Sequence, residues 1–484
     1  MSEKEVHGLD RRTLIKSAGG LVLGLAATAY AAAPRKRFVL VGTGSRARIY
    51  TDALTGKYRA GNELVALSDI NPGRLALAIK TIAAAGAGKP KGYEAADFDR
   101  MIRETRPQTV IVTTPDATHS DYIVRALDAG CDVITEKPMT TTAEKAQQIL
   151  DACRRNDRHV RVTFNYRYSP PRTQIKDMLM NNDIGDVLSV DFHWLLNTVH
   201  GADYFRRWHS DKAISGGLMV HKATHHFDLV NWWLGAQPQV VQAAGMRQFY
   251  TPDMAKRMGL KSHHERCTTC TEKNSCNFYF NLASHPGLKA LYQDNEHHDG
   301  YFRDRCVWRP QISIEDTMNV MVRYDTGTTL SYSLNAFNSW EGYHIAFNGT
   351  KGRLEHQIVE QVGVAGADET PGKIQDDGVR TRIIPLRGPP LDIEPWTAKG
   401  GHGGGDDAML DEIFGTAAAD KYMRASDERG GAYSILIGVA ANRGFETGQP
   451  TRIDELVTGL TPPDRAPMPS RTASVPMPMR VDIP

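Results

Sequence analysis

The chain lacks any internal apolar run of the roughly 18 residues that a membrane-spanning helix needs. It also lacks a marked excess of charge, because 58 Lys and Arg against 56 Asp and Glu leave a formal net charge of +2. Composition therefore does not favour nucleic acid or an anionic membrane surface as a partner. Hydrophobic residues make up 41% of the chain, which is enough for an ordinary soluble core. The length of 484 residues predicts two or more domains.

The one notable hydrophobic stretch lies at the N-terminus and has the pattern of an export signal. Arg11 and Arg12 precede an Ala- and Gly-rich apolar segment over residues 21–33, with a small-x-small cleavage pattern at 29–31. We expect residues 1–33 to be a twin-arginine signal peptide, an amphipathic helix being the alternative. This predicts export, to the periplasm, through the twin-arginine translocase and no membrane span after cleavage. Because that route carries folded proteins, a nicotinamide cofactor would have to be bound tightly enough to travel with the protein.

The next segment is typical of a dinucleotide-binding turn. Residues 37–41 are an apolar run of buried-strand length, and a G-x-G-x-x-A pattern follows directly. The first glycine permits a tight turn, the second lets the backbone approach a pyrophosphate, and the small third residue lets helix and strand pack closely. The following helix N-terminus then faces the phosphate charge. The cofactor-binding residues predicted at this turn are Gly42, Gly44, Ser45, Arg46 and Ala47.

The choice between NAD and NADP depends on a carboxylate one strand further on. The second predicted strand, residues 64–68, ends at Asp69, which can accept hydrogen bonds from both ribose hydroxyls and so favours NAD. Arg46 and Arg74 offer a site for a 2′-phosphate, so NADP stays open. The alternative for Asp69 is an Asx turn with Asn71.

Two more predicted strands, residues 109–113 and 131–135, also end in polar clusters. Ligands of parallel sheets bind outside the C-terminal strand ends, so both clusters are expected to face the cofactor. We place a Rossmann domain over residues 34–156. The cofactor contacts expected at these two strand ends are Thr114, Pro115, His119, Glu136 and Lys137.

The sequence here resembles the Gfo/Idh/MocA (glucose–fructose oxidoreductase / inositol dehydrogenase) family. The resemblance rests on the G-x-G-x-x-A turn, on Thr114-Pro115 with His119, on Glu136-Lys137-Pro138 and on His225 with Asp228. It covers residues 36 to about 448. It implies an α/β protein with an N-terminal Rossmann domain and a C-terminal α+β domain, over 157–460, with a large, mostly antiparallel open sheet. Such a sheet often supports a homo-oligomer, here a dimer or tetramer.

The resemblance also implies catalytic roles. Lys137 matches a lysine beside the nicotinamide, where an ammonium stabilises a developing alkoxide, and Glu136 can orient it. His225 matches the general acid/base histidine on an expected helix over 216–235, with Asp228 holding its far ring nitrogen. His221 stands where the family usually has an aspartate. A metal held by the two helix-spaced histidines is an alternative.

Aromatic and polar residues around this helix suit a carbohydrate, which presents apolar C–H faces and many hydroxyls. A purely structural role is equally open for many of them. The resemblance implies that Tyr166 and Arg167 line the pocket. The substrate-binding residues predicted are Tyr166, Arg167, Tyr204, Arg207, Trp208, His221, Lys222 and His402.

Four of the six cysteines fall in a charged insertion at about 260–310, namely Cys267, Cys270, Cys276 and Cys306. Their spacing favours a structural zinc site, with two disulfides, an iron–sulfur cluster or free thiols as alternatives. In each case we expect the cysteine cluster to stabilise the insertion at a position away from the catalytic residues. The proline-rich tail over 461–484 is expected to lie as an extended arm over the surface or over a neighbour.

These features predict an NAD(P)-dependent oxidoreductase that transfers hydride between a sugar or polyol carbinol and a tightly bound nicotinamide. His225 or Lys137 takes the hydroxyl proton. The main alternative is a redox-neutral, NAD-dependent glycoside hydrolase that oxidises, eliminates and then reduces its substrate. A third hypothesis is a non-catalytic sensor of a sugar or of the cofactor.

Overall fold

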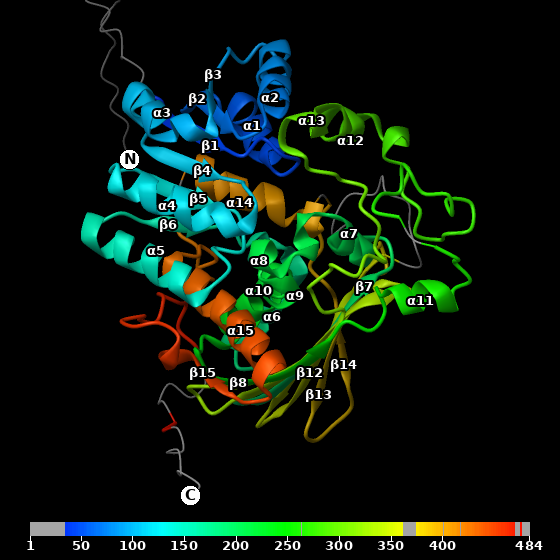
Figure 1. Cartoon of the computed structure of the whole chain (residues 1–484). Coiled ribbons are helices and arrows are strands. Elements are labelled where there is room, and N and C mark those ends of the chain that lie inside the picture. The colour runs from blue at the N-terminus through cyan, green and yellow to red at the C-terminus, as the bar shows by residue number, and fades with distance from the viewer. Residues whose placement is uncertain are drawn as a thin grey trace, which may run out of the picture. The chain divides into compact units, whose positions relative to one another are not determined.

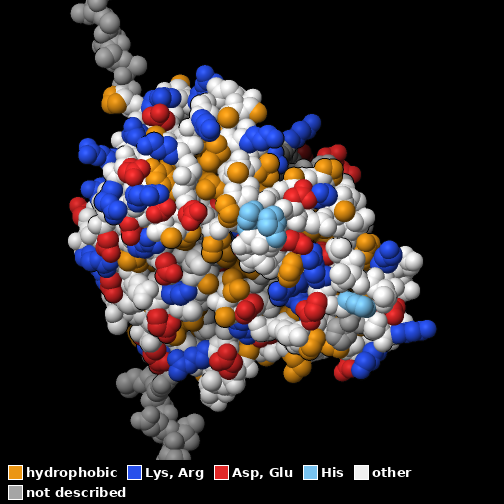
Figure 2. Space-filling model, turned by 45° about the horizontal axis from the view of Figure 1, so that its top comes forward, with side chains coloured by type: hydrophobic (Ala, Val, Ile, Leu, Met, Phe, Trp, Pro, Cys, Tyr) orange, Lys and Arg blue, Asp and Glu red, His pale blue; other side chains and the backbone are white. Residues whose placement is uncertain are grey.

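The computed structural model describes residues 34–262, 264–361, 374–399, 401–416, 418–469 and 475–476, and the described residues from 35 onward group into one compact unit. The expected signal peptide, residues 1–33, lies outside the described residues. Among the residues that are described, no helix is long and apolar enough to cross a membrane. Positive and negative side chains are interspersed over the face shown in Figure 2.

The N-terminal half forms a six-stranded parallel sheet in the order β3-β2-β1-β4-β5-β6. Its strand cores are almost continuously apolar, as expected for a parallel sheet covered on both faces by helices. All four residues of β4 are buried. The elements are β1 Lys36–Val41, α1 Ala47–Thr55, β2 Asn62–Asp69, α2 Pro72–Ala84, β3 Lys91–Glu94, α3 Phe98–Thr105, β4 Thr109–Val112, α4 His119–Asp128, β5 Asp132–Thr135, α5 Ala143–Asn156 and β6 Val160–Val162. The predicted Rossmann fold is confirmed.

The C-terminal half forms a nine-stranded sheet in the order β14-β13-β12-β11-β7-β10-β9-β8-β15. All neighbouring pairs in it are antiparallel except β10 with β7. Buried and exposed residues alternate along β9 and β10, so the sheet packs one face against the core. The strands are β7 Val187–Asn197, β8 Pro238–Met246, β9 Thr317–Tyr324, β10 Thr329–Asn338, β11 Glu341–Gly349, β12 Gly352–Gln361, β13 Val379–Pro385, β14 Leu391–Ile393 and β15 Thr451–Arg452. The predicted mostly antiparallel open sheet is therefore confirmed.

Helices fill the space between the two sheets (Figure 1). The central one, α10, is buried along its whole length. The helices of this half are α6 Pro170–Met180, α7 His200–Arg206, α8 Lys212–Ser215, α9 Gly217–His221, α10 Thr224–Leu234, α11 Pro252–Arg257, α12 Pro286–Leu291, α13 Glu296–Asp299, α14 Gly405–Phe414 and α15 Glu428–Thr447.

The expected continuous helix over 216–235 is wrong in one respect. The chain breaks between α9 and α10, so His221 ends one helix and His225 lies in the first turn of the next. The predicted stop at Gly235 is present, in the left-handed conformation with φ 63°. The two histidines therefore do not share one helical face, and the site is built at a junction of two helix ends.

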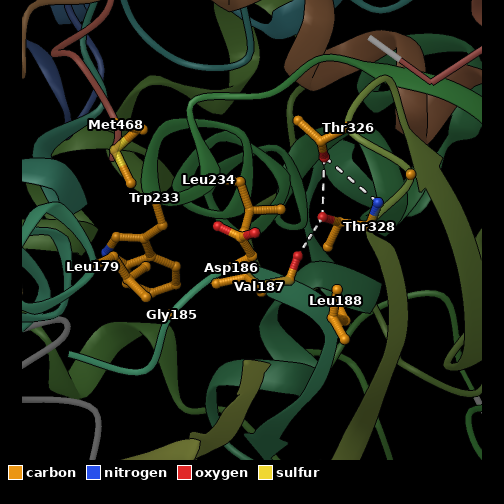
Figure 3. Close-up of a pocket in the computed structure, with 11 residues that line it drawn as sticks. Leu179, Gly185, Asp186, Val187, Leu188, Trp233, Leu234, Thr326, Thr328 and Met468 are labelled. Atoms are coloured by element: carbon orange, nitrogen blue, oxygen red, sulfur yellow. Dashed lines mark hydrogen bonds between the residues drawn. The ribbon is translucent and has the colours of Figure 1, made fainter. Parts of the chain in front are cut away.

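The described part of the C-terminal tail packs on the chain's own surface. Arg465 donates to the Ala236 carbonyl at 3.0 Å, and the Val475 amide donates to the Asp325 carbonyl at 2.7 Å. Met468 lies beside Trp233 at the pocket shown in Figure 3, which the tail closes together with α10 and the β9–β10 turn. This pocket contains none of the predicted site residues.

Candidate active site

The dinucleotide turn is shaped by a close approach between two strand ends. Gly42 has φ 91°, and a Cβ there would lie 2.8 Å from the backbone of Thr113 and Thr114. Only glycine combines this backbone conformation with the missing side chain. The Gly42 amide donates to the Ser68 carbonyl at 2.8 Å, and α1 begins at Ala47. The turn thus lies where the strand order reverses between β1 and β4, the place where Rossmann sheets bind dinucleotides.

Asp69 at the end of β2 is heavily engaged within the protein. One carboxylate oxygen accepts from the Thr43 amide and hydroxyl at 2.6 and 2.8 Å. The other accepts from the Asn71 amide at 2.7 Å and lies 3.3 Å from Arg74. The carboxylate therefore ties the dinucleotide turn to β2 and forms the Asx-type contact that the alternative interpretation predicted.

Glu136 does not hold the lysine beside it through a hydrogen bond. Its carboxylate accepts from Arg46 Nε and from the Tyr50 hydroxyl, each at 2.6 Å. Burial alone would raise the pKa of Glu136, but Arg46 and Tyr50 outweigh it, so the pKa is lowered and the group stays ionised. Arg46 also lies 3.4 Å from Asp406. Glu136 therefore acts on Lys137 through its charge, and Arg46 is held by two carboxylates at the start of α1.

The two strand-end loops are joined by a histidine. His119 places its ring nitrogens 2.8 Å from the Pro138 carbonyl and 2.9 Å from the Thr114 carbonyl. The Lys137–Pro138 peptide bond is cis. His119 thus fixes the position of the loop that carries Lys137, and Thr114 and Pro115 form the facing loop.

Lys137, His221 and Asp116 form a chain of titratable groups. Lys137 Nζ lies 3.4 Å from His221 Nε2, and His221 Nδ1 lies 2.5 Å from the Asp116 carboxylate. Burial lowers the pKa of Lys137 to about 8, although Asp116 and Glu136 act in the opposite direction. Burial also raises the pKa of Asp116 and lowers that of His221. The contacts thus offer a path for a proton between Lys137 and Asp116 through His221.

Asp116 was missed by the sequence analysis. Its only signal was its place directly after Thr114-Pro115, at a strand end that faces the cofactor. Nothing in the sequence pairs it with His221, 105 residues further along the chain. This pairing also explains how a histidine can stand where the family usually has an aspartate, because the carboxylate comes from the other domain.

His225 is stacked beneath an aromatic ring. Its imidazole lies parallel to Tyr166, with ring centroids 4.3 Å apart, and burial lowers its pKa, so it is neutral. Its Nδ1 is buried without a hydrogen-bond partner among the described residues. The expected contact from Asp228 is absent, because Asp228 binds Arg167 through two hydrogen bonds of 2.6 and 2.7 Å. This ring nitrogen is therefore available to a hydrogen-bonding group that the chain itself does not supply.

Lys222 and Tyr166 form a second pair of titratable groups, joined by a hydrogen bond. Lys222 Nζ donates to the Tyr166 hydroxyl at 3.2 Å and lies 4.7 Å from the centroid of the Trp194 ring. Burial lowers the pKa of Lys222. The Arg172 guanidinium lies 4.1 Å from the centroid of the Tyr166 ring. Trp194 of β7 and Arg172 of α6 were not among the predicted site residues.

The other predicted substrate residues lie at different distances from His221 and Tyr166. Tyr204 lies 5.5 Å from His221 between ring centroids, and His402 lies 5.7 Å from Tyr166. Trp208 stacks on His209, a residue that was not predicted. The ring centroids of His209 and His221 lie 4.2 Å apart. Arg167 and Arg207 are held by ion pairs with Asp228 and Asp203, and His402 Nδ1 lies 2.8 Å from the Asp406 carboxylate.

The four cysteines of the Cys-rich insertion line one cavity as free thiols, which was one of the alternatives. The favoured zinc site is not seen, because no three His, Cys, Asp or Glu side chains in the described ranges form a group that could hold a metal ion, and no such group includes His221 and His225 either. The insertion reaches the dinucleotide turn, where the Tyr292 hydroxyl lies 3.1 Å from the Ser45 amide. Ion pairs such as Arg266 with Glu296 support the insertion instead.

Fold and site together define a Rossmann-type oxidoreductase with a separate substrate domain. The description "Oxidoreductase family, NAD-binding Rossmann fold" matches residues 36–164, and "Oxidoreductase family, C-terminal alpha/beta domain" matches residues 176–453. The chain therefore belongs to the Gfo/Idh/MocA oxidoreductase family, and it is an NAD-binding member of it.

Two relatives in sequence and one solved structure are similar to the chain. It is 38% identical over 432 residues to the putative oxidoreductase YteT of Bacillus subtilis, covering 87% of this chain and 98% of that protein. It is 28% identical to an inositol 2-dehydrogenase of Rhizobium meliloti over 43% of this chain and 57% of that one. The fold matches an oxidoreductase from Agrobacterium radiobacter in complex with NAD+, L-tartaric acid and magnesium, with a TM-score of 0.57, 14% identity, and coverage of 88% and 100%.

The β1–α1 turn fits a dinucleotide on its own geometry. Gly42 and Gly44 leave the backbone free of side chains, and the first turn of α1 carries no acidic residue to repel a pyrophosphate. The residues that would hold NAD are those of this turn, with Thr114, Pro115 and Lys137 towards the nicotinamide end.

Proposed function

We propose that the protein transfers hydride between a carbinol carbon of a sugar or polyol and a tightly bound NAD. The observation that carries this proposal is the proton chain in which Lys137 Nζ lies 3.4 Å from His221 Nε2 and His221 Nδ1 lies 2.5 Å from Asp116. Oxidation of a carbinol needs a base for the hydroxyl proton next to the hydride acceptor. Lys137 meets that need because it titrates near pH 8 and keeps part of its surface exposed.

Bound NAD supplies the acceptor for the hydride that leaves the carbinol carbon. The neutral Lys137 amine accepts the hydroxyl proton, so the C–H and O–H bonds break and a carbonyl forms. His221 passes that proton towards Asp116, whose raised pKa suits a temporary proton store. His225 orients the substrate hydroxyls through its free ring nitrogen. In the reverse direction protonated Lys137 returns the proton to the alkoxide.

The substrate class is inferred from the walls of the site. Trp208 keeps part of its aromatic surface exposed for C–H faces, while Lys222 and His402 supply polar contacts. Relatives are named glucose-6-phosphate 3-dehydrogenase and inositol 2-dehydrogenase, and a protein of similar fold is an aldose-aldose oxidoreductase. We therefore propose a cyclic polyol or an aldose as the substrate.

A panel of aldoses, uronic acids and inositols tests this proposal. Purified protein is mixed with each compound, and reduction of its NAD is followed by absorbance of the reduced nicotinamide at single turnover. A substrate should give a stoichiometric rise in absorbance that is reversed by the matching ketone or lactone. The proposal is wrong if protein that contains NAD shows no redox exchange with any member of the panel.

The Lys222–Tyr166 pair favours a second candidate, a redox-neutral glycoside hydrolase. Such an enzyme needs one group for the hydroxyl proton and another for the C–H proton or the leaving group, and this site has two separate pairs of titratable groups. Aryl glycosides distinguish the two functions. Release of the aglycone without net NADH supports the hydrolase, whereas NADH accumulation without release of the aglycone supports the dehydrogenase.

We also propose that the protein is exported through the twin-arginine route with NAD already bound, as the paired Arg11 and Arg12 suggest. Fractionation of expressing cells tests this, and an R11K/R12K variant should remain in the cytoplasm.

Assembly into a homo-oligomer is proposed from the outer face of the second sheet, where Met246 and Met321 are 61% and 57% exposed. Light scattering of the purified protein measures that assembly.

A further inference from the structure

The Cys-rich insertion reaches the dinucleotide turn. Its helices α12 and α13 lie beside α2 (Figure 1). The Tyr292 hydroxyl lies 3.1 Å from the Ser45 amide and 2.9 Å from the Ser45 hydroxyl. In the Rossmann arrangement this part of the turn faces the pyrophosphate. A residue 247 positions away in the sequence therefore brings its hydroxyl within hydrogen-bonding reach of the turn that would hold a pyrophosphate.

The same insertion also contacts the ribose end of the site. Asp299 forms an ion pair of 2.6 Å with Arg74, and the Asn71 side chain donates to the Asn295 carbonyl at 2.9 Å. The approach is close, because a Cβ on Gly73 at the start of α2 would come within 1.9 Å of the Asn295 side-chain oxygen and would displace that side chain.

The insertion is anchored at its other side to the substrate domain. Arg303 binds Asp203 of α7 through two hydrogen bonds of 2.6 and 2.9 Å. Arg206, also on α7, donates to the Phe278 carbonyl at 2.5 Å. Helix α7 carries Tyr204 of the candidate site. The insertion therefore links the wall of the substrate site to the adenosine end of the cofactor site.

We propose that this insertion completes the NAD site, with Tyr292 donating to a pyrophosphate oxygen seated at Ser45, and with Asp299 selecting against NADP. Asp299 and Asp69 together neutralise Arg74, the cation that would otherwise bind a 2′-phosphate, and their charge repels that phosphate. Because the insertion is held to α2 on one side and to α7 on the other, it slows the release of bound dinucleotide. This proposal rests on the proposed function, in that the β1–α1 turn must bind NAD.

The Tyr292→Phe variant tests the pyrophosphate contact, with Tyr279→Phe in the same insertion as the matched control. NAD content is measured by native mass spectrometry, and the dissociation rate by fluorescence after dilution. Loss of a hydrogen bond to a charged oxygen should speed NAD release by about tenfold to hundredfold, while the control releases NAD at the wild-type rate. Release that is unchanged or slower in Tyr292→Phe overturns the proposal, because a hydroxyl that merely occupied the turn would compete with NAD.

The Asp299→Asn variant tests cofactor selection, with Asp294→Asn as control because Asp294 pairs with Lys289 on the exposed surface of the insertion. Removing the charge should raise the ratio of NADP+ to NAD+ affinity about tenfold, measured by calorimetry on protein stripped of nucleotide. An unchanged ratio overturns the selection role. If the wild-type protein binds neither dinucleotide, the proposed function itself fails; if it binds NAD and the variants match their controls, only the role of the insertion fails.

Discussion

Replacing Lys137 by arginine gives the sharpest test of the proton chain. A guanidinium keeps the positive charge but does not release its proton in a protein, so it cannot act as the base. With a pKa of about 8, about a tenth of the Lys137 amine is neutral at pH 7 and about nine tenths at pH 9. In the oxidising direction kcat/KM of the wild type should therefore rise about tenfold between pH 7 and pH 9.

The size of the loss follows from the same reasoning. General base catalysis contributes about 10²- to 10⁴-fold, so Lys137→Arg should lower the rate of NAD reduction by that factor, or about 3–5 kcal/mol of barrier. NAD content should stay at the wild-type level, which separates a loss of chemistry from a loss of cofactor. The assay is single-turnover absorbance of the reduced nicotinamide over pH 6–10. The matched control is Lys57→Arg, because Lys57 pairs with Asp411 on the exposed surface.

Two results would refute this argument. A wild-type profile that is flat over pH 6–10 would show that Lys137 does not titrate in the rate-determining proton transfer. An arginine variant that keeps every activity of the wild type would remove the lysine from the chemistry and would favour the non-catalytic sensor.

Three further predictions follow from single contacts. Asp116→Asn removes a negative charge that raises the pKa of Lys137, so the rise of kcat/KM with pH should move to lower pH than in the wild type. Asp228→Ala leaves the Arg167 guanidinium buried without its partner and should lower the free energy of unfolding in urea by about 3–5 kcal/mol, whereas Asp464→Ala, at an exposed pair with Arg429, should cost under about 1 kcal/mol; equal effects would contradict the buried pair. Gly42→Ala should lose bound NAD in native mass spectrometry, because its Cβ meets the backbone of Thr113 and Thr114, while Gly61→Ala, with open space around it, should keep its NAD.

Parts of the site could be predicted from local sequence patterns where residues that are neighbours in the chain are also neighbours in the site. The G-x-G-x-x-A turn, the strand ends at Thr114 and Lys137 and the stop at Gly235 all depend on residues within one turn or one strand end. The break between α9 and α10 was not visible, because the apolar spacing over 216–235 continues through it. The partners of Asp228 and Glu136 were also not visible, since Arg167 and Arg46 lie 61 and 90 residues away.

The sequence by itself determined the order of strands and helices, the Rossmann turn and the lysine at a strand end, because hydrophobic period and backbone sterics act over a few residues. Tertiary structure alone decided which charges meet: His221 with Asp116 across the domains, Asp228 with Arg167 instead of His225, and Tyr292 of the insertion with Ser45. The physical reason is that ion pairs and hydrogen bonds act only over a few ångströms. Which groups come that close depends on how the two sheets and the insertion pack.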